Sequence, residues 1–240
     1  MNKIKLSLVA ALLAGTTTLS ADLASDVEVS ANVALTSHYV WRGMSQSDNL
    51  PAIQGGVDLG YKGFYLGTWA SNVDFDNTET STEFDFYAGY ASEIEKFSYD
   101  VGFIQYTYPG DTDNLNFSEA YLSLGYDFDV LAVSATYSMG VDAKVAGSDT
   151  FGDAMEVGVS VPLPMDITLD GTYGNYDNKN EDTGGNLNAY GDYYSVSLTK
   201  TFGKFDTTVA YTGMDYDVAT NGRDGDGSDD FVVLTIGTSF

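Results

Sequence analysis

Carboxylates are the side chains of this sequence most able to do chemistry, with 35 Asp and Glu residues against 10 Lys and Arg. Many of them fall inside segments in which polar and apolar residues alternate. A second group is concentrated in the glycine-rich stretch 221–230. The chain holds one histidine, His38, and no cysteine. These residues suggest three kinds of chemistry to test: a charged passage, a site for a hard cation, or acid and base catalysis.

The stretch 221–230, NGRDGDGSDD, has the composition of a cation-binding loop. Asp224, Asp226 and Asp229 offer the oxygen ligands that calcium prefers, and the glycines between them permit tight turns. The stretch lacks the spaced glutamate of an EF-hand loop. We therefore expect a solvated acidic loop tip, with calcium binding as the alternative, and we expect no other metal site and no cofactor.

His38 is the candidate general base. A protease or phospholipase would need this histidine to be held against a nucleophile or an acid. The sequence pattern alone brings no serine or aspartate to it. We expect His38 to be a wall side chain on the inward face of a strand, and we expect the protein not to be an enzyme.

Alternation with a period of two residues runs through most of the chain from Val27 onwards and predicts β-strands. The last strand shows the pattern on one face, with Val232, Leu234, Ile236, Thr238 and Phe240. Such segments, with the mixed segment 64–73 included, number about twelve and are about ten residues long. An even number and this length are typical of bacterial transmembrane barrels.

Aromatic residues gather at the expected strand ends. The first strand is predicted to run from Val27 to Arg42, with an apolar face that ends in two rings and with His38 on the opposite face. Aromatic rings that carry a polar group are favoured at the level of the lipid headgroups, so we expect these residues to form a girdle on the outer face of the barrel. Its members are Tyr39, Trp41, Tyr61, Tyr99 and Tyr126. The alternative is aromatic packing in a soluble β core.

Tight turns and longer polar segments alternate along the chain. The tight turns are expected at 62–63, 95–96, 127–129, 162–164 and 203–204. The longer segments are 43–50, 74–82, 109–116, 140–152, 177–189 and 217–229. This sorting predicts an all-β fold, an up-and-down antiparallel transmembrane β-barrel with short periplasmic turns and long extracellular loops. No change in composition marks a second domain, so residues 22–240 are expected to form one barrel.

Residues 1–21 have the layout of a secretory signal peptide. Lys3 and Lys5 precede the apolar run 6–13, and a polar stretch leads to Ala21, after which we expect cleavage. The apolar run is too short to cross a bilayer as a helix. The mature protein is expected in the outer membrane of a Gram-negative bacterium, in contact with lipid and lipopolysaccharide.

Charge and hydropathy narrow the class of protein. The net charge of −25 excludes nucleic acid as a partner, because the two surfaces would repel each other. The mean hydropathy of −0.12 is too polar for a helical membrane protein. It suits a barrel, in which only alternate residues meet lipid.

The alternation also assigns a direction to the carboxylates within strands. A charge that faces the bilayer midplane is costly, so the acids opposite the apolar face are expected to line the lumen. These acids are Asp58, Asp85, Asp100, Glu119, Glu156, Asp166, Asp170 and Asp206. Arg42 is almost the sole base expected among them, and His38 is expected to be mostly neutral at pH 7. A lumen of this kind favours cations.

Three segments resemble known outer-membrane proteins. A closing strand that ends on an aromatic residue, here Phe240, resembles the terminal strand of barrels whose last residue is read by the barrel-assembly machinery. Residues 31–56, ANVALTSHYVWRGMSQSDNLPAIQGG, and 63–73, GFYLGTWASNV, resemble the opening of the TorF-type porins of proteobacteria. The similarity then extends diffusely to the end of the chain. It implies an outer-membrane channel and names no solute.

The function expected from these features is passive diffusion of small solutes or ions through a cation-preferring channel. One alternative is a structural or adhesive barrel with a plugged lumen, which acts through its acidic surface loops. The other is a soluble periplasmic β-protein. Single-channel conductance separates the first two, and detergent-dependent extraction separates both from the third.

Overall fold

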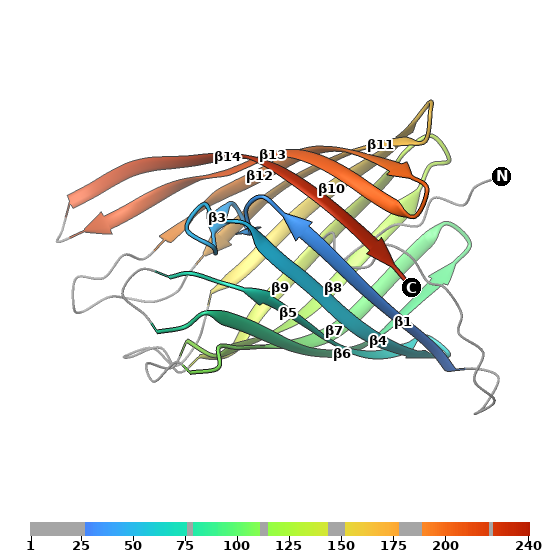
Figure 1. Cartoon of the computed structure of the whole chain (residues 1–240), viewed down its shortest axis with the longest axis horizontal. Coiled ribbons are helices and arrows are strands. Elements are labelled where there is room, and N and C mark those ends of the chain that lie inside the picture. Colours follow the sequence, from blue (N-terminus) through green and yellow to red (C-terminus); the bar gives the residue numbers. More distant parts are fainter. Residues whose placement is uncertain (1–26, 76–78, 111–114, 144–151, 178–188, 221–222) are drawn as a thin grey trace.

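The computed structural model describes residues 27–75, 79–110, 115–143, 152–177, 189–220 and 223–240. In these ranges twelve strands form one closed antiparallel barrel, which confirms the predicted fold class (Figure 1). The barrel strands are β1 (Val27–Thr36), β4 (Ala52–Tyr61), β5 (Phe64–Asn72), β6 (Thr82–Ile94), β7 (Phe97–Thr107), β8 (Phe117–Asp127), β9 (Ala132–Ala143), β10 (Asp153–Leu163), β11 (Ile167–Asp177), β12 (Ala189–Phe202), β13 (Phe205–Thr220) and β14 (Arg223–Ser239). A separate hairpin consists of β2 (Val40–Trp41) and β3 (Met44–Ser45). No helix within the described ranges has the length and hydrophobicity needed to cross a membrane.

Neighbouring barrel strands along the chain pair with each other, and β1 pairs with β14 to close the ring. The closing register runs from Asn32 opposite Ser239 to Thr36 opposite Thr235. Beyond it, the amide of Phe240 donates to the carbonyl of Ala31 at 2.8 Å, and the amide of Ala31 donates back at 3.1 Å. The barrel sheet therefore has no open edge, which is the condition for a sheet to lie in lipid.

The two faces of the sheet differ as the alternation predicts. On β8, Tyr121 and Ser123 are 9% and 0% exposed, whereas Leu122 and Leu124 between and beside them are 48% and 40% exposed. The same exposure of large apolar side chains recurs on the other barrel strands. An outer surface of this kind is stable against hydrocarbon and unfavourable against water.

Short connections gather at one end of the barrel, on the right in Figure 1. They are residues 62–63, 95–96, 128–131, 164–166 and 203–204, so two of the predicted turns lie one or two residues later than expected. Lys62 and Gly63 both have positive φ, 51° and 89°, as a type I′ hairpin turn requires. Asp166, which we expected on the inward face of a strand, lies in a turn with φ of 55°.

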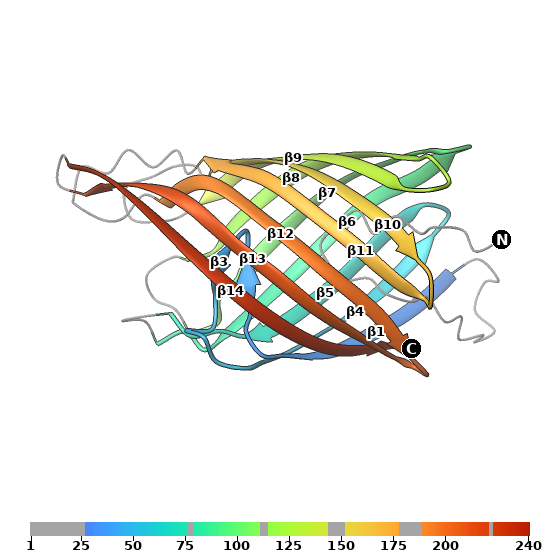
Figure 2. The ribbon, with the colours of Figure 1, turned by 90° about the horizontal axis from the view of Figure 1, so that it is seen from above.

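The last hairpin corrects one predicted loop. Residues 217–229 were expected to form a long connection, but β13 and β14 stay paired almost to residue 221 and project beyond the other strands (Figures 1 and 2). Asp217 is opposite Asp226, and Met214 is opposite Asp229. Continuous backbone pairing replaces the series of tight turns that the glycines suggested.

Aromatic side chains cover the outer face close to the short turns. Tyr61 and Tyr126 are 46% and 41% exposed, and Tyr99 shares their outward orientation. The expected places of Tyr39 and Trp41 in this girdle are wrong. β1 ends at Thr36, so both rings leave the wall and lie inside the barrel, where Tyr39 is 9% exposed.

Replacing Val159 by Arg should lower the free energy of unfolding by about 2 to 4 kcal/mol, because Val159 faces outward near the middle of β10. The matched control is Ser160→Arg, which places the new charge on the inner face directly opposite Asp170. Denaturant unfolding in lipid vesicles measures both changes. Equal losses would contradict the assignment of the faces.

Deleting Phe240 should reduce the amount of assembled protein in the outer membrane much more than Thr238→Val does. The deletion removes the terminal ring and both backbone hydrogen bonds to Ala31, whereas the control keeps the register of the closing strand. Immunoblots of outer-membrane fractions, with and without heating of the samples, measure the assembled amount. Normal levels of the truncated protein would contradict the role of Phe240.

Candidate functional site

Residues 37–51, between β1 and β4, fold into the barrel, and we call them the inner arm. Figures 1 and 2 look along perpendicular directions, and both place β3 within the ring of barrel strands. Within the arm, Val40 pairs with Ser45 and Trp41 pairs with Met44. The sequence predicted a strand up to Arg42 and an outer loop at 43–50. Both predictions are wrong, because the chain turns inward after Thr36, whose hydroxyl donates to the carbonyl of His38 at 3.0 Å.

The base of the inner arm is tied to the wall on two sides. Ser37 donates its amide to the carbonyl of Leu234 on β14 at 2.8 Å and accepts the amide of Leu234 on its hydroxyl at 2.9 Å. On the other side, the amide of Asp74 donates to the carbonyl of Gln46 at 2.9 Å. These bonds use backbone groups that the wall strands leave free, so the arm has a defined position.

The tip of the inner arm touches the opposite wall. Arg42 and Gly43 have φ of 46° and 76°, which forms a tight turn between β2 and β3. A Cβ atom at position 43 would collide with the carbonyl of Gly213 on β13, so this contact requires glycine. Met44 packs against a cluster that includes Tyr176 and Met214.

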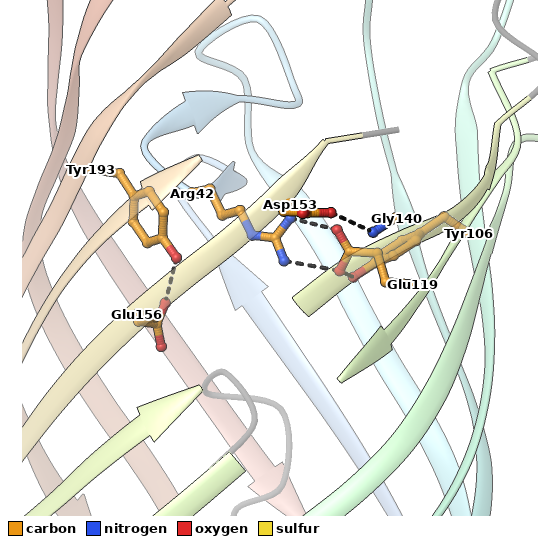
Figure 3. A network of polar contacts seen from close by, with 7 residues as sticks. All are labelled: Arg42, Tyr106, Glu119, Gly140, Asp153, Glu156 and Tyr193. Atoms are coloured by element: carbon orange, nitrogen blue, oxygen red, sulfur yellow. Dashed lines mark hydrogen bonds and ion pairs between the residues drawn. The ribbon is translucent and has the colours of Figure 1, made fainter. Parts of the chain in front are cut away.

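A buried ion pair anchors the tip (Figure 3). The two terminal nitrogens of Arg42 donate to the two carboxylate oxygens of Glu119 at 2.6 and 2.9 Å. The side chains are 11% and 2% exposed. The guanidinium carbon lies 4.3 Å from the ring centre of Trp41 and 5.2 Å from that of Tyr176. Bidentate geometry and cation–π contacts together offset the cost of burying the charges.

The pairing of β8 with β9 is irregular beside Glu119, where β9 has one extra residue. The register between β8 and β9 shifts between Ser118, opposite Asp142, and Glu119, opposite Gly140. Such bulges change the direction of a side chain locally. The hydroxyl of Tyr106 also lies 3.5 Å from Glu119, at the long limit of a hydrogen bond.

The indole of Trp41 fills the space between two parts of the wall. Its ring centre lies 5.9 Å from Tyr106 on β7, 6.0 Å from Phe117 on β8 and 5.6 Å from Tyr176 on β11. The inner arm therefore reaches across the interior, so that any passage through the barrel must run beside it.

Tyrosine hydroxyls donate to three of the predicted lumen acids. Asp58 accepts from Tyr87 at 2.5 Å, Asp100 accepts from Tyr65 at 2.7 Å, and Glu156 accepts from Tyr193 at 3.1 Å (Figure 3 for the last pair). A neutral hydroxyl orients a carboxylate without cancelling its charge. We did not predict these tyrosines from the sequence, although they share the inward parity of the acids, which is the signal that identifies them.

The remaining predicted acids lie on the same inner surface. Asp85 on β6 is 3% exposed, and Asp170 on β11 is half-buried. Asp206 accepts a hydrogen bond from Thr201 at 2.6 Å near the short turns.

His38 lies in the inner arm and not on a barrel strand. It is 6% exposed, its Nε2 is 2.7 Å from the hydroxyl of Ser45, and its ring meets Phe231 edge to face at 4.5 Å. Burial lowers the pKa of His38, and the charge of Asp48 opposes part of that change. The structure thus places Ser45 beside His38, a contact that the sequence pattern did not predict. Within the part of the chain described, no carboxylate hydrogen-bonds to the imidazole, so the pair lacks the group that orients a catalytic histidine.

The candidate calcium residues do not form a wrapped loop. Asp224 and Asp226 belong to β14 and are paired in register with Ala219 and Asp217. A calcium loop needs a chain that curls around the ion, and an extended paired strand does not curl. In the described residues no group of three or more His, Cys, Asp or Glu could hold a metal ion.

A closed barrel with an apolar outer face, a polar interior and a connection folded inside is the architecture of outer-membrane porins. The KdgM porin shares 13% sequence identity with this chain at a TM-score of 0.57, over 88% of this chain and 98% of that one. The NanC porin shares 15% sequence identity at a TM-score of 0.57, over 88% of this chain and 98% of that one. The COG4313 outer membrane channel from Pseudomonas putida F1 shares 12% sequence identity at a TM-score of 0.50, over 91% of this chain and 97% of that one. At such identities the similarity establishes the fold.

The chain belongs to the family described as "Bacterial protein of unknown function (Gcw_chp)", which matches residues 20–240. No curated protein matches the sequence significantly.

Replacing Glu119 by Gln should destabilise the protein by about 3 to 5 kcal/mol, because it leaves the guanidinium of Arg42 buried without a counter-charge. The double variant Arg42→Met with Glu119→Gln should recover most of that loss. Denaturant unfolding of the two single variants and the double variant gives the coupling energy. Additive effects would contradict the anchoring role of the pair.

Proposed function

We propose that this protein is a porin-like channel in the outer membrane of a Gram-negative bacterium, through which small solutes diffuse passively and cations are preferred. The observation that carries the proposal is a closed, lipid-compatible barrel whose inner face is acidic. The resemblance of residues 31–56 to TorF-type porins agrees with this function. The signal peptide that such a location requires would be residues 1–21, which lie outside the described residues.

Charge is unevenly divided between the two faces. The predicted lumen acids on strands all lie on the inner surface, whereas the described lysines lie in short turns or on the outer face: Lys62, Lys96, Lys200 and Lys204. Arg42 is the base that the described part of the chain places inside, and Glu119 compensates it. Fixed negative charge in a low-dielectric passage concentrates cations and repels anions.

The acidic interior separates this chain from one of its structural neighbours. The KdgM porin has been solved in complex with disordered oligogalacturonate, which is a polyanion. An inner face with more carboxylates than bases disfavours a ligand of that charge. We therefore propose cations and small neutral solutes as the permeating species.

The inner arm supports a second candidate, a structural or adhesive barrel that does not conduct. Trp41 packs between β7, β8 and β11, and the tip contacts β13. If these contacts occlude the interior, the acidic connections at the end opposite the short turns would be the working surface. Conductance distinguishes the two functions.

In planar bilayers the wild type should conduct and prefer K⁺ over Cl⁻ at low salt. Arg42→Met should increase the K⁺ preference, and Glu119→Gln should decrease it. Both variants remove the same ion pair, so any loosening of the arm is common to them and only the sign of the remaining charge differs. Zero-current potentials across a KCl gradient measure the preference.

Ionic strength provides a further check of the same experiment. The reach of fixed charges falls from about 30 Å at 0.01 M salt to about 3 Å at 1 M, so the selectivity should fade over that range. A wild-type preference for Cl⁻ would overturn the acidic-passage proposal. Absence of conductance in the wild type, together with conductance after shortening of the arm, would favour the occluded barrel.

A further inference from the structure

Two carboxylates on β6 lie deep in the interior beside the inner arm. Glu83 and Asp85 are 2% and 3% exposed. They are two residues apart on one strand, so they share the inner face at a spacing of about 7 Å. The hydroxyl of Tyr39, in the inner arm, donates to Glu83 at 2.9 Å.

These two acids have no base beside them in the described residues. The guanidinium of Arg42 uses both of its terminal nitrogens on Glu119, and a second ion pair, Lys96 with Asp129, lies at a short turn. A buried carboxylate without a counter-charge is strongly disfavoured. Glu83 and Asp85 are therefore either protonated or paired with a cation.

Aromatic rings flank Asp85 on both sides. Trp69 on β5 and Tyr106 on β7 are each its direct partner in the register, with Cβ atoms about 5 Å away. The ring of Tyr39 meets Trp69 at 5.4 Å, and Trp41 meets Tyr106 at 5.9 Å. Aromatic faces around a carboxylate attract organic cations in particular, through the negative potential of the rings.

Asp85 and Trp69, which are partners in the register of β6 and β5, each carry an unpartnered polar atom. The Oδ1 atom of Asp85 has no hydrogen-bond partner, and neither has the indole nitrogen of Trp69, which is 3% exposed. A buried acceptor and a buried donor, each without a partner, therefore belong to residues that are opposite each other in the register of two neighbouring strands. A ligand that carries a donor group next to an acceptor atom would complement them.

We propose that Glu83, Asp85 and Trp69, with the rings of Tyr39 and Tyr106, form a binding site for a small protonated amino alcohol. The ammonium group would donate to Asp85 and Glu83, and the hydroxyl oxygen would accept from the indole nitrogen of Trp69. Calcium prefers six to eight oxygen ligands, and two carboxylates fall short of that number. As a site on the route of a cation-preferring channel, it rests on the proposed function, but its binding is measured without conductance.

The test is a titration of the full chain in detergent micelles at neutral pH with ethanolamine hydrochloride, followed by tryptophan fluorescence and calorimetry. The chain has two tryptophans, Trp41 and Trp69, and both lie at or near the proposed site. We expect saturable binding that KCl at the same ionic strength does not reproduce. Ethylamine hydrochloride, which lacks the hydroxyl, should bind several-fold more weakly.

Two variants and one matched control locate the binding. Asp85→Asn and Glu83→Gln should each weaken ethanolamine binding about tenfold or more, since each removes a charged acceptor. Asp170→Asn makes the same change on the inner face of β11 and should leave binding unchanged. The mobility of unheated samples in gels shows that each variant is folded.

An equal response to ethanolamine and KCl, or calorimetric heats without saturation, would overturn the site. It would favour the alternative in which the two carboxyl groups are protonated. Equal affinity for ethylamine would overturn the role given to Trp69. Saturable binding by a protein that does not conduct would keep the site and reject the channel. Conductance without saturable binding would keep the channel and reject the site.

Discussion

Closure of the sheet between β1 and β14 is the constraint on which the rest of the structure depends. An unpaired backbone amide or carbonyl in lipid is costly, so a sheet there must return to its first strand. Ala31 and Phe240 exchange both of their backbone hydrogen bonds, which carries the pairing to the last residue. Closure also decides which face of every strand points inward. Acids and tyrosines from strands far apart in the chain then share one enclosed surface.

The inner arm occupies that surface because its own contacts suit the interior better than lipid or water. Tyr39 and Trp41 bring apolar area, and Arg42 brings a charge that would be expensive to bury alone. Glu119 supplies the counter-charge from β8, opposite a bulge in β9, and Gly43 permits close approach to β13. A segment that joins two neighbouring strands is thereby attached to the far wall, and the interior is narrowed at that level.

Two arrangements of buried charge coexist inside the barrel. Around Arg42 and Glu119 the charges cancel and serve to hold the arm in place. Around Glu83 and Asp85 they do not cancel in the described residues, and the neighbours are rings and a hydrogen-bonding hydroxyl. Tyrosines orient most of the other inner acids while leaving their charge available. The interior is therefore structured by hydrogen bonds and rich in carboxylates, as the proposed cation passage requires.

The sequence by itself determined the strands, their inward and outward faces, the short turns and the acidic character of the interior. These follow from alternation with period two, which a lipid-facing wall enforces at every strand. Only the tertiary structure decided that residues 37–51 turn inward, that Arg42 pairs with Glu119, and that β13 and β14 continue through the predicted loop. The physical reason is distance along the chain. The residues that the inner arm contacts on β8, β11 and β13 lie several strands later in the sequence, and the residues around Trp41 carry no local pattern that predicts these contacts.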